Sequence, residues 1–184
     1  VESPESLGAP ADNGFRLQET RTMNAKDVFK STIEMTHGIT KGYLSDMSDA
    51  DLMVRTSPAA NHIAWQLGHL IASEHHFLTG LGQPVKALPD GFAEAHSKEA
   101  ATSDDPKKFF KKEQYLALMG SMHDATLAAM AKTPDADLDK PGPAEMKEYA
   151  PTIGSVFNLI GLHEMMHSGQ IVAIRRKLGK PVMF

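Results

Sequence analysis

The 184-residue chain contains no cysteine, which excludes disulfide bonds, thiolate metal ligands and a cysteine nucleophile. It also lacks an apolar run of the ~18 residues that a membrane-spanning helix requires. Its net charge is −4 and its basic residues form no long block, so neither nucleic acid nor a membrane is an expected partner. Any bound metal ion must be held by imidazole or carboxylate groups, and the composition fits a cytoplasmic protein.

The composition divides the chain into an extension and one domain. Residues 1–22 contain two prolines and two glycines and show no sustained apolar period, so we expect a flexible N-terminal extension. This segment also lacks the long apolar stretch of a signal peptide. Residues 23–184 are long enough to bury one hydrophobic core, and we expect a single domain there.

Four segments have the apolar spacing of amphipathic helices. They are roughly residues 25–47, 60–79, 105–131 and 152–178. Pro106 lies where the first turn of the third helix is expected. The connections at 80–104 and 132–151 are long, with a short helix expected around 92–98, and no segment shows convincing strand alternation. The sequence therefore predicts an all-α four-helix bundle with long connecting loops.

The most informative motif is the run HEMMH from His163 to His167, which matches the H-E-x-x-H helix of zinc proteases. In those enzymes the two histidines bind zinc and the glutamate is the general base. The seventeen residues after His167 contain no His, Asp, Glu or Cys that could complete such a site. The chain also offers no clear strand beside which a peptide could bind. The peptidase interpretation is therefore disfavoured, and further ligands must come from upstream.

His163 and His167 lie one turn apart on an apolar stripe of the last predicted helix. The stripe continues through four apolar residues: Val156, Ile160, Ile171 and Ile174. Two neutral imidazoles in an apolar seam are costly to bury, and one metal ion would satisfy both. The alternative is a pair of separate core histidines, each hydrogen-bonded to a carbonyl or carboxylate.

A third ligand is expected on the second predicted helix, where His62, His69 and His76 recur every seven residues. His69 lies in the middle of this helix, next to Gly68, which would let another helix approach closely. We therefore predict His69 as the third ligand. His62 and His76 lie near the helix ends and would line a pocket mouth or be exposed, and His96 in the polar linker is expected to be solvated.

Three histidines with a vacant fourth position are typical of a catalytic zinc site. Neutral ligands leave the full +2 charge of the ion, which favours hydroxide, an anionic substrate or a thiolate as partner. Zinc suits these ligands best, although imidazole also accepts nickel, iron or copper. Glu164 and Glu74 are the candidate proton-transfer residues. Glu164 lies about 100° around the helix from His163, so both glutamates, like Glu34, are alternatively carboxylates that only support a ligand.

Two blocks of the sequence resemble the DinB-like (YfiT-like) family of metalloenzymes. The run NHIAWQLGHL, which begins at Asn61 and is followed by Glu74, looks like the second-helix signature of that family. The run HEMMHSGQI, which begins at His163 and precedes a basic Leu-Gly segment, looks like its fourth-helix block. The resemblance covers about residues 23–184.

The resemblance implies an up-down-down-up bundle, often dimeric, with metal ligands at His69, His163 and His167. Known relatives include thiol-dependent S-transferases and a mycothiol-dependent maleylpyruvate isomerase, so a low-molecular-weight thiol is an expected cofactor. Two functions remain as alternatives. One is a metal-dependent transferase or hydrolase acting on a small molecule. The other is a non-catalytic bundle that uses the metal to hold an anionic ligand or to stiffen its core.

Overall fold

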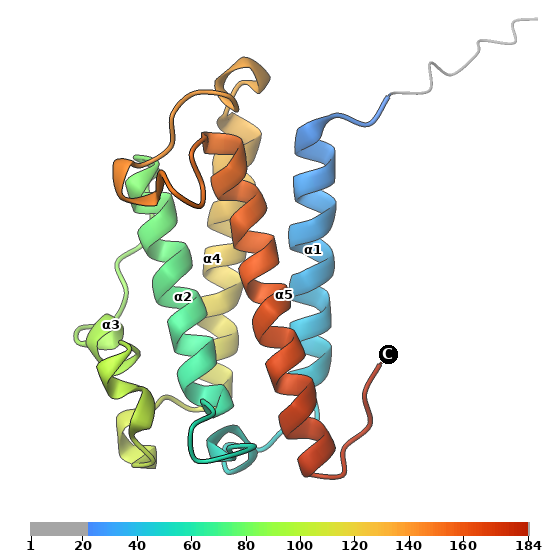
Figure 1. The fold of residues 1–184 in the computed structure, drawn as a ribbon, viewed down its shortest axis with the longest axis vertical. Coiled ribbons are helices and arrows are strands. Elements are labelled where there is room, and N and C mark those ends of the chain that lie inside the picture. The colour runs from blue at the N-terminus through green and yellow to red at the C-terminus, as the bar shows by residue number, and fades with distance from the viewer. Residues whose placement is uncertain (1–21, 184) are drawn as a thin grey trace, which may run out of the picture.

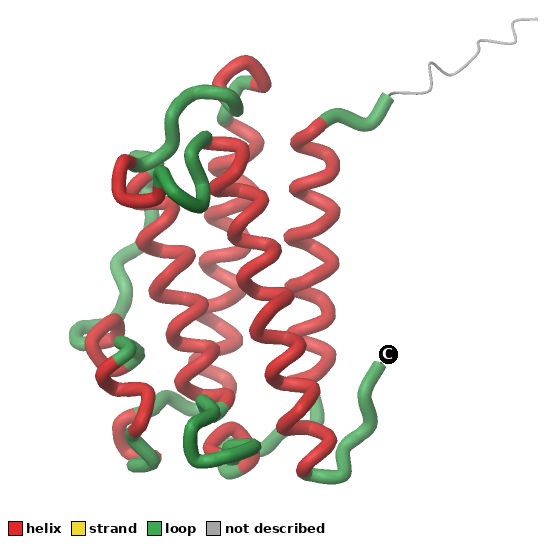
Figure 2. Tube along the Cα trace, in the orientation of Figure 1, coloured by secondary structure: helices red, strands yellow, loops and turns green. Residues whose placement is uncertain are grey.

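The computed structural model describes residues 22–183, which form a bundle of four long helices (Figure 1). The long helices are α1 (Ala25–Leu44), α2 (Ile63–Gly80), α4 (Lys112–Lys132) and α5 (Ile153–Lys177), and the short α3 is Phe92–Ala95. In the described part of the chain there is no strand, only an isolated bridge between Pro141 and Thr152 (Figure 2). The all-α prediction is confirmed. The predicted extension lies outside the described residues, apart from its last residue.

The four long helices run up, down, down and up in chain order. Helices α1 and α5 point in one direction and α2 and α4 in the other, because the segment between α2 and α4 returns along the length of the bundle and carries α3 (Figure 1). Helix α1 packs mainly against α5, and α2 packs against both α4 and α5. This order confirms the topology that the resemblance implied. None of the described helices is both long and apolar enough to cross a membrane.

Helix α4 begins at Lys112, later than the predicted start at residue 105. Pro106 begins only a short 3-10 turn, and the backbone is extended again at Phe109. The side chain of Phe109 is buried, and the hydroxyl of Tyr115 accepts a hydrogen bond from the backbone of Phe110. Packing of this linker against the core therefore overrides the helical pattern of its sequence.

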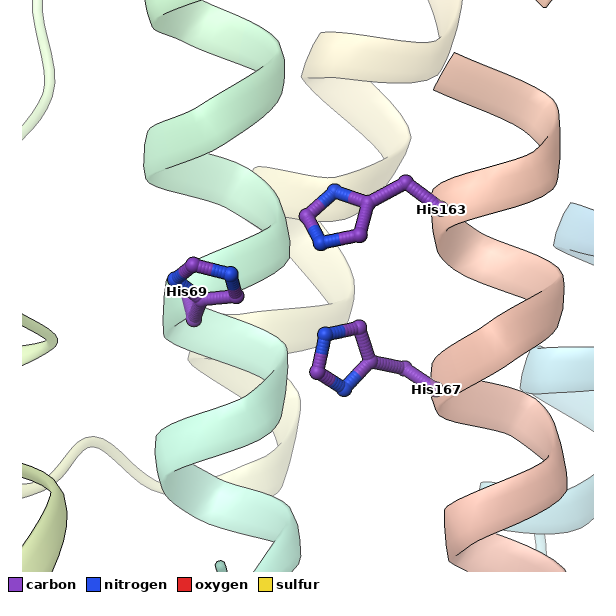
Figure 3. Close-up of side chains that lie close together, drawn as sticks. All are labelled: His69, His163 and His167. Atoms are coloured by element: carbon purple, nitrogen blue, oxygen red, sulfur yellow. The ribbon is translucent and has the colours of Figure 1, made fainter. Parts of the chain in front are cut away.

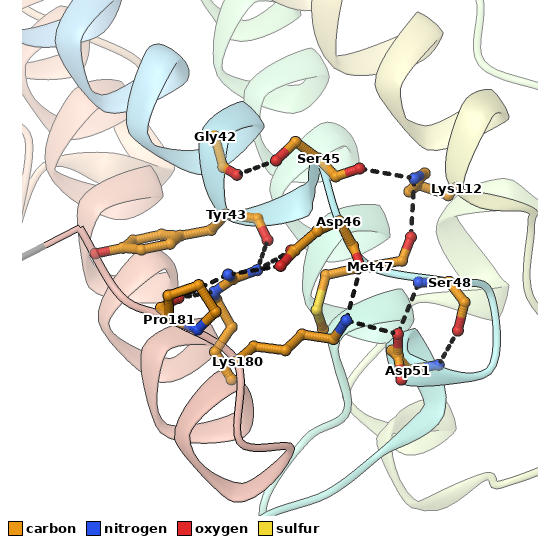
Figure 4. Close-up of polar contacts among 11 residues, drawn as sticks. Gly42, Tyr43, Ser45, Asp46, Met47, Ser48, Asp51, Lys112, Lys180 and Pro181 are labelled. Atoms are coloured by element: carbon orange, nitrogen blue, oxygen red, sulfur yellow. Dashed lines mark hydrogen bonds and ion pairs between the residues drawn. The ribbon is translucent and has the colours of Figure 1, made fainter.

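Arg175 fastens the end of α5, which carries two of the predicted ligands, to the end of α1. This buried guanidinium donates hydrogen bonds to the backbone carbonyls of Tyr43 and Pro181 and to the carboxylate of Asp46. Lys180 adds a hydrogen bond to the Asp46 carbonyl (Figure 4). These contacts fix how far α5 is shifted along α1, and with it the height of the α5 histidines in the bundle.

Candidate metal centre

The structure brings the three predicted ligands together at the interface of α2 and α5 (Figure 3). One ligand-capable nitrogen from each of His69, His163 and His167 lies within 4.8 Å of the others. The ring centroids are 5.1 Å apart for His69 and His163, 5.4 Å for His69 and His167, and 5.0 Å for His163 and His167. Each zinc–imidazole bond is about 2.0–2.1 Å long, so two nitrogens on one ion lie at most about 4.2 Å apart, and small rotations of the rings would let one ion contact all three.

The predicted stripe on α5 accounts for the position of His163 and His167. Its four apolar members are at most 5% exposed, so this face of α5 is fixed against the core. His167 is buried with them, whereas His163 and His69 are half-buried at the edge of the helix pair. The group is therefore anchored on its inner side and accessible on its outer side.

Trp65 holds the ring of His69 from one side. Its indole lies parallel to the imidazole, with 4.8 Å between ring centroids and 6° between ring planes. The indole Nε1 donates a hydrogen bond of 2.9 Å to the carbonyl of Ser97 in the linker after α3. The linker thus orients Trp65, and Trp65 limits the rotation of His69.

The prediction that His96 is solvated is wrong, because this side chain is 1% exposed. Its ring nitrogens lie 2.8 Å from the carbonyl of Phe92 and 2.8 Å from the hydroxyl of Tyr115. The ring rests on Gly68, where an added Cβ would stand 2.0 Å from a carbon of the imidazole. Gly68 does permit a close approach, but the partner is this linker histidine and not another helix.

We expect the substitution Gly68→Ala to destabilise the protein by about 1–3 kcal/mol, because the buried, hydrogen-bonded ring of His96 must move. Urea unfolding of the metal-free protein would measure the change. The matched control is Gly120→Ala on α4, where an added Cβ meets nothing within 4 Å and helix propensity favours alanine by up to about 1 kcal/mol. Equal effects of the two substitutions would contradict the packing argument.

Gln66 is a buried residue of the centre that the sequence did not single out. Its Oε1 accepts a hydrogen bond of 3.2 Å from Nδ1 of His167, and its Nε2 donates one of 2.8 Å to the carbonyl of Asn61. This arrangement places the proton of His167 on Nδ1 and leaves Nε2 free to bind a metal ion. The available signal was a glutamine within an otherwise apolar helix segment.

Removal of this hydrogen bond in Gln66→Leu should weaken metal binding about 10–100-fold, because His167 loses the partner that fixes its tautomer and orientation. Competition against a chelator of known affinity would measure the change. Gln66→Glu keeps an acceptor at the same position and should retain most of the affinity. If both variants bound the metal as wild type does, Gln66 would have no part in the centre.

The three imidazoles are neutral at neutral pH in the metal-free protein. Burial, together with the other histidines of the group, lowers the pKa of His163 and of His167 to about 4. Burial also lowers the pKa of His69, and the positive charge of nearby Lys98 lowers it further. Since metals bind the neutral form of imidazole, no proton has to be displaced when an ion enters near pH 7.

A family model described as the DinB superfamily matches residues 32–171, a range that includes all three histidines. The chain belongs to the DinB superfamily. No curated protein matches this DinB sequence.

Two solved structures resemble the DinB chain. A conserved protein from Enterococcus faecalis has a TM-score of 0.61 at 13% identity and covers 86% of this chain and 100% of its own. YfiT from Bacillus subtilis has a TM-score of 0.56 at 17% identity and covers 91% of this chain and 95% of its own. YfiT is described as "a probable metal-dependent hydrolase with an unusual four-helix bundle topology". At these identities the likeness shows the fold alone.

The predicted proton-transfer residues lie on the core side of the DinB centre. Glu164 is 9% exposed, and its Oε1 is 3.6 Å from Nδ1 of His37 on α1. Glu74 accepts a hydrogen bond from the hydroxyl of Thr126 on α4. Both carboxylates line a small cavity that borders His163 but neither of the other two histidines of the group. Of the three histidines, His163 is therefore the one beside which the two carboxylates lie.

The other candidates near the DinB centre have structural or solvent-facing roles. His62 is fully buried, where it caps α2 by accepting a hydrogen bond from the backbone of Trp65, so the expectation that it is exposed or lines a pocket mouth is wrong. His76 is exposed and lies 3.9 Å from Glu145. Glu34 is exposed and pairs with a lysine of its own helix, so it does not support a ligand.

Proposed function

We propose that this DinB-superfamily chain is a metal-dependent enzyme that acts on a small molecule at the three-histidine centre, as a hydrolase or a thiol S-transferase. The observation that carries the proposal is the spacing of the three imidazoles, whose ligand atoms lie within 4.8 Å of one another. The partial exposure of His69 and His163 supports access by a substrate from outside. A closed structural site would instead use four protein ligands.

The donor set fits a divalent ion of the zinc class. Three nitrogen donors from neutral imidazoles suit zinc, nickel or iron, and a tetrahedral ion would keep one further position. A bound ion of this kind supplies a lowered pKa to a water molecule or thiol beside it. Trp65 and Gln66 support this function because they orient the His69 and His167 rings before any ion binds. The description of YfiT as a metal-dependent hydrolase favours water as nucleophile.

We further propose that Glu74 and Glu164 are positioning residues in this reaction. Their carboxylates share the cavity behind His163, on the side that faces the core. A carboxylate behind a metal-binding histidine orients the ring and raises its basicity as a ligand. Their role would therefore appear in metal affinity more than in proton transfer to the substrate.

Metal content and turnover of the purified protein test the proposed function together. Untagged protein would be analysed by mass spectrometry for bound metals, then stripped and reloaded with zinc, nickel or iron. Each form would be assayed for hydrolysis of activated esters and for transfer of a small thiol to an electrophilic chloroarene. We expect turnover that chelation removes and metal restores. A folded protein that binds no divalent metal would overturn the proposal.

A non-catalytic metal-binding bundle is the second candidate. The observation that favours it is the location of the histidines on two different helices, so that an ion would link α2 to α5 and stiffen the core. This function predicts a large rise in melting temperature on metal binding and no turnover with any substrate class. Loss of a reaction in a centre variant of unchanged stability would exclude it.

A further inference from the structure

A polar layer, buried except for the half-buried Glu74, crosses the bundle next to the three-histidine centre. It contains His37 from α1, Glu74 from α2, Thr126 from α4 and Glu164 from α5, so each long helix contributes a polar side chain. Of the apolar residues that border the layer, Ile71 and Met119 belong to one core cluster and Phe77 and Ile160 to another, one toward each end of the bundle. Polar groups in such a position are costly to bury unless each has a partner.

The layer brings two carboxyl groups together without a lysine or arginine among the described residues that line its cavity. Oε1 of Glu164 is buried without a hydrogen-bond partner among the described residues, and Nδ1 of His37 at 3.6 Å is the cation-capable group beside it. Burial and the charge of Glu164 raise the pKa of Glu74 to about 7. The unpartnered oxygen of Glu164 is therefore the feature of the layer that the described residues leave unexplained.

The cavity between these groups has the size of a single ion. Its volume is about 10 Å³, at the lower limit of what one water molecule needs, and a divalent cation is smaller than water. Two imidazoles, those of His37 and His163, complete its polar lining. Carboxylates and imidazoles that project inward from facing helices are a known way for a four-helix bundle to hold metal ions.

We propose that this cavity binds a second divalent cation through Glu74, Glu164 and His37, next to the three-histidine centre. Two carboxylates would neutralise its charge, and the ion would satisfy the unpartnered oxygen of Glu164. Among the described residues, only the three histidines form a group of three whose ligand atoms lie within 4.8 Å of one another. Because Glu164 and His37 are already 3.6 Å apart, a second ion would require Glu74 to move toward them. That movement would require Glu74 to turn from Thr126 toward the cavity.

The two sites differ in the ions that they prefer. Three imidazoles favour zinc or nickel, whereas a pair of carboxylates with one imidazole favours harder ions such as manganese, iron or magnesium. His163 borders the second cavity and belongs to the first site, so the ions would lie on two sides of one imidazole. The proposal goes beyond the proposed function, since the second site would exist whether or not the first is catalytic.

Manganese is the probe that tests the proposal, because it is paramagnetic and suits carboxylate ligands. Mn²⁺ would be titrated into protein whose three-histidine centre is already filled with zinc, and free Mn²⁺ would be followed by its electron paramagnetic resonance signal. We expect about one Mn²⁺ per chain, and at least about tenfold weaker binding in Glu74→Gln and in His37→Gln. In metal-free protein, Glu74→Gln should also raise the melting temperature, because it removes one of two repelling carboxylates.

Two control variants locate the bound manganese. Glu34→Gln makes the same change on an exposed glutamate one turn from His37 and should leave Mn²⁺ binding unchanged. His69→Ala disables the three-histidine centre and, titrated without zinc, should still bind about one Mn²⁺ per chain, which separates this proposal from the proposed function. The proposal is overturned if zinc-loaded wild type binds no Mn²⁺. It is also overturned if Glu74→Gln binds Mn²⁺ like wild type, or if Glu34→Gln weakens binding equally.

Discussion

Replacement of His69 by Ala is expected to weaken metal binding by a factor of about 10²–10⁴. Protein zinc sites have apparent binding free energies of about 10–16 kcal/mol, so the loss of one of three ligands should cost about 3–5 kcal/mol. His69 is the member of the group that α2 contributes, and without it an ion would be held by α5 alone. Any reaction at the centre should be lost with the ion. Isothermal titration with zinc and an activity assay of the reloaded protein would measure both effects.

The control for this variant is His76→Ala, which makes the same change two turns further along α2 at an exposed position. It should bind metal and react as wild type does. The stability of the His69→Ala variant then separates the two candidate functions. An enzyme should lose turnover while its metal-free form remains about as stable as wild type, whereas a structural site should lose mainly the stabilisation by metal. Unchanged metal affinity in His69→Ala would remove the three-histidine centre from both functions.

The regular spacing of apolar residues and histidines along α5 made the positions of His163 and His167 predictable from the sequence. His163 and His167 share a helical stripe with residues that have to be buried, so the direction of both side chains followed from the helical period. The position of His69 followed less directly, from its place in the middle of an apolar helix. A bundle interior brings the middle parts of facing helices together, and this general property put His69 near the pair.

The linker between α2 and α4 was not predictable in the same way. The burial of His96 depends on the absence of a side chain at Gly68 and on a hydroxyl from Tyr115, far away in sequence. The late start of α4 depends on Phe109, whose side chain enters the core only because the linker folds back. Such contacts arise from tertiary packing between segments that have no regular spacing of apolar residues. The periodicity of the sequence therefore cannot predict them.

The structure also narrows the meaning of H-E-x-x-H in this chain. The two histidines of the motif turn toward α2, whereas the glutamate between them turns toward His37 on α1. A general base must reach the reacting proton directly or through one water molecule. Glu164 lies instead on the core side of His163, in the polar layer that lines the small cavity. In this chain the two histidines of the motif belong to the three-histidine centre and its glutamate belongs to the polar layer. This differs from the arrangement in a zinc protease, where the glutamate is the general base.

Acid is expected to destabilise the metal-free protein by about 2–3 kcal/mol between pH 7 and pH 5. Burial lowers the pKa of His62, His163 and His167 to about 4 from an ordinary value of 6.5. Below pH 6.5 the unfolded chain takes up protons on these residues while the folded protein does not, so stability falls with pH until about pH 4. Each histidine should contribute about 1.5–2 kcal/mol at pH 5, reduced for the partly exposed His163. Burial raises the pKa of Glu74 to about 7, so this carboxylate takes up a proton in the folded protein over the same pH range and offsets about 2 kcal/mol of the loss.

Urea unfolding at pH 7 and pH 5 would measure this loss in metal-free protein, and the variant His62→Asn tests its origin. Asparagine is a good helix N-cap but does not titrate, so the variant should keep the start of α2 and lose about 1.5–2 kcal/mol of the pH dependence. Zinc should protect the protein by a similar amount at both pH values, because His163 and His167, with a pKa of about 4 in the folded protein, are still mostly neutral at pH 5. A metal-free protein equally stable at both pH values would show that these histidines are accessible to protons in the folded state. The argument that burial keeps them neutral would then be wrong.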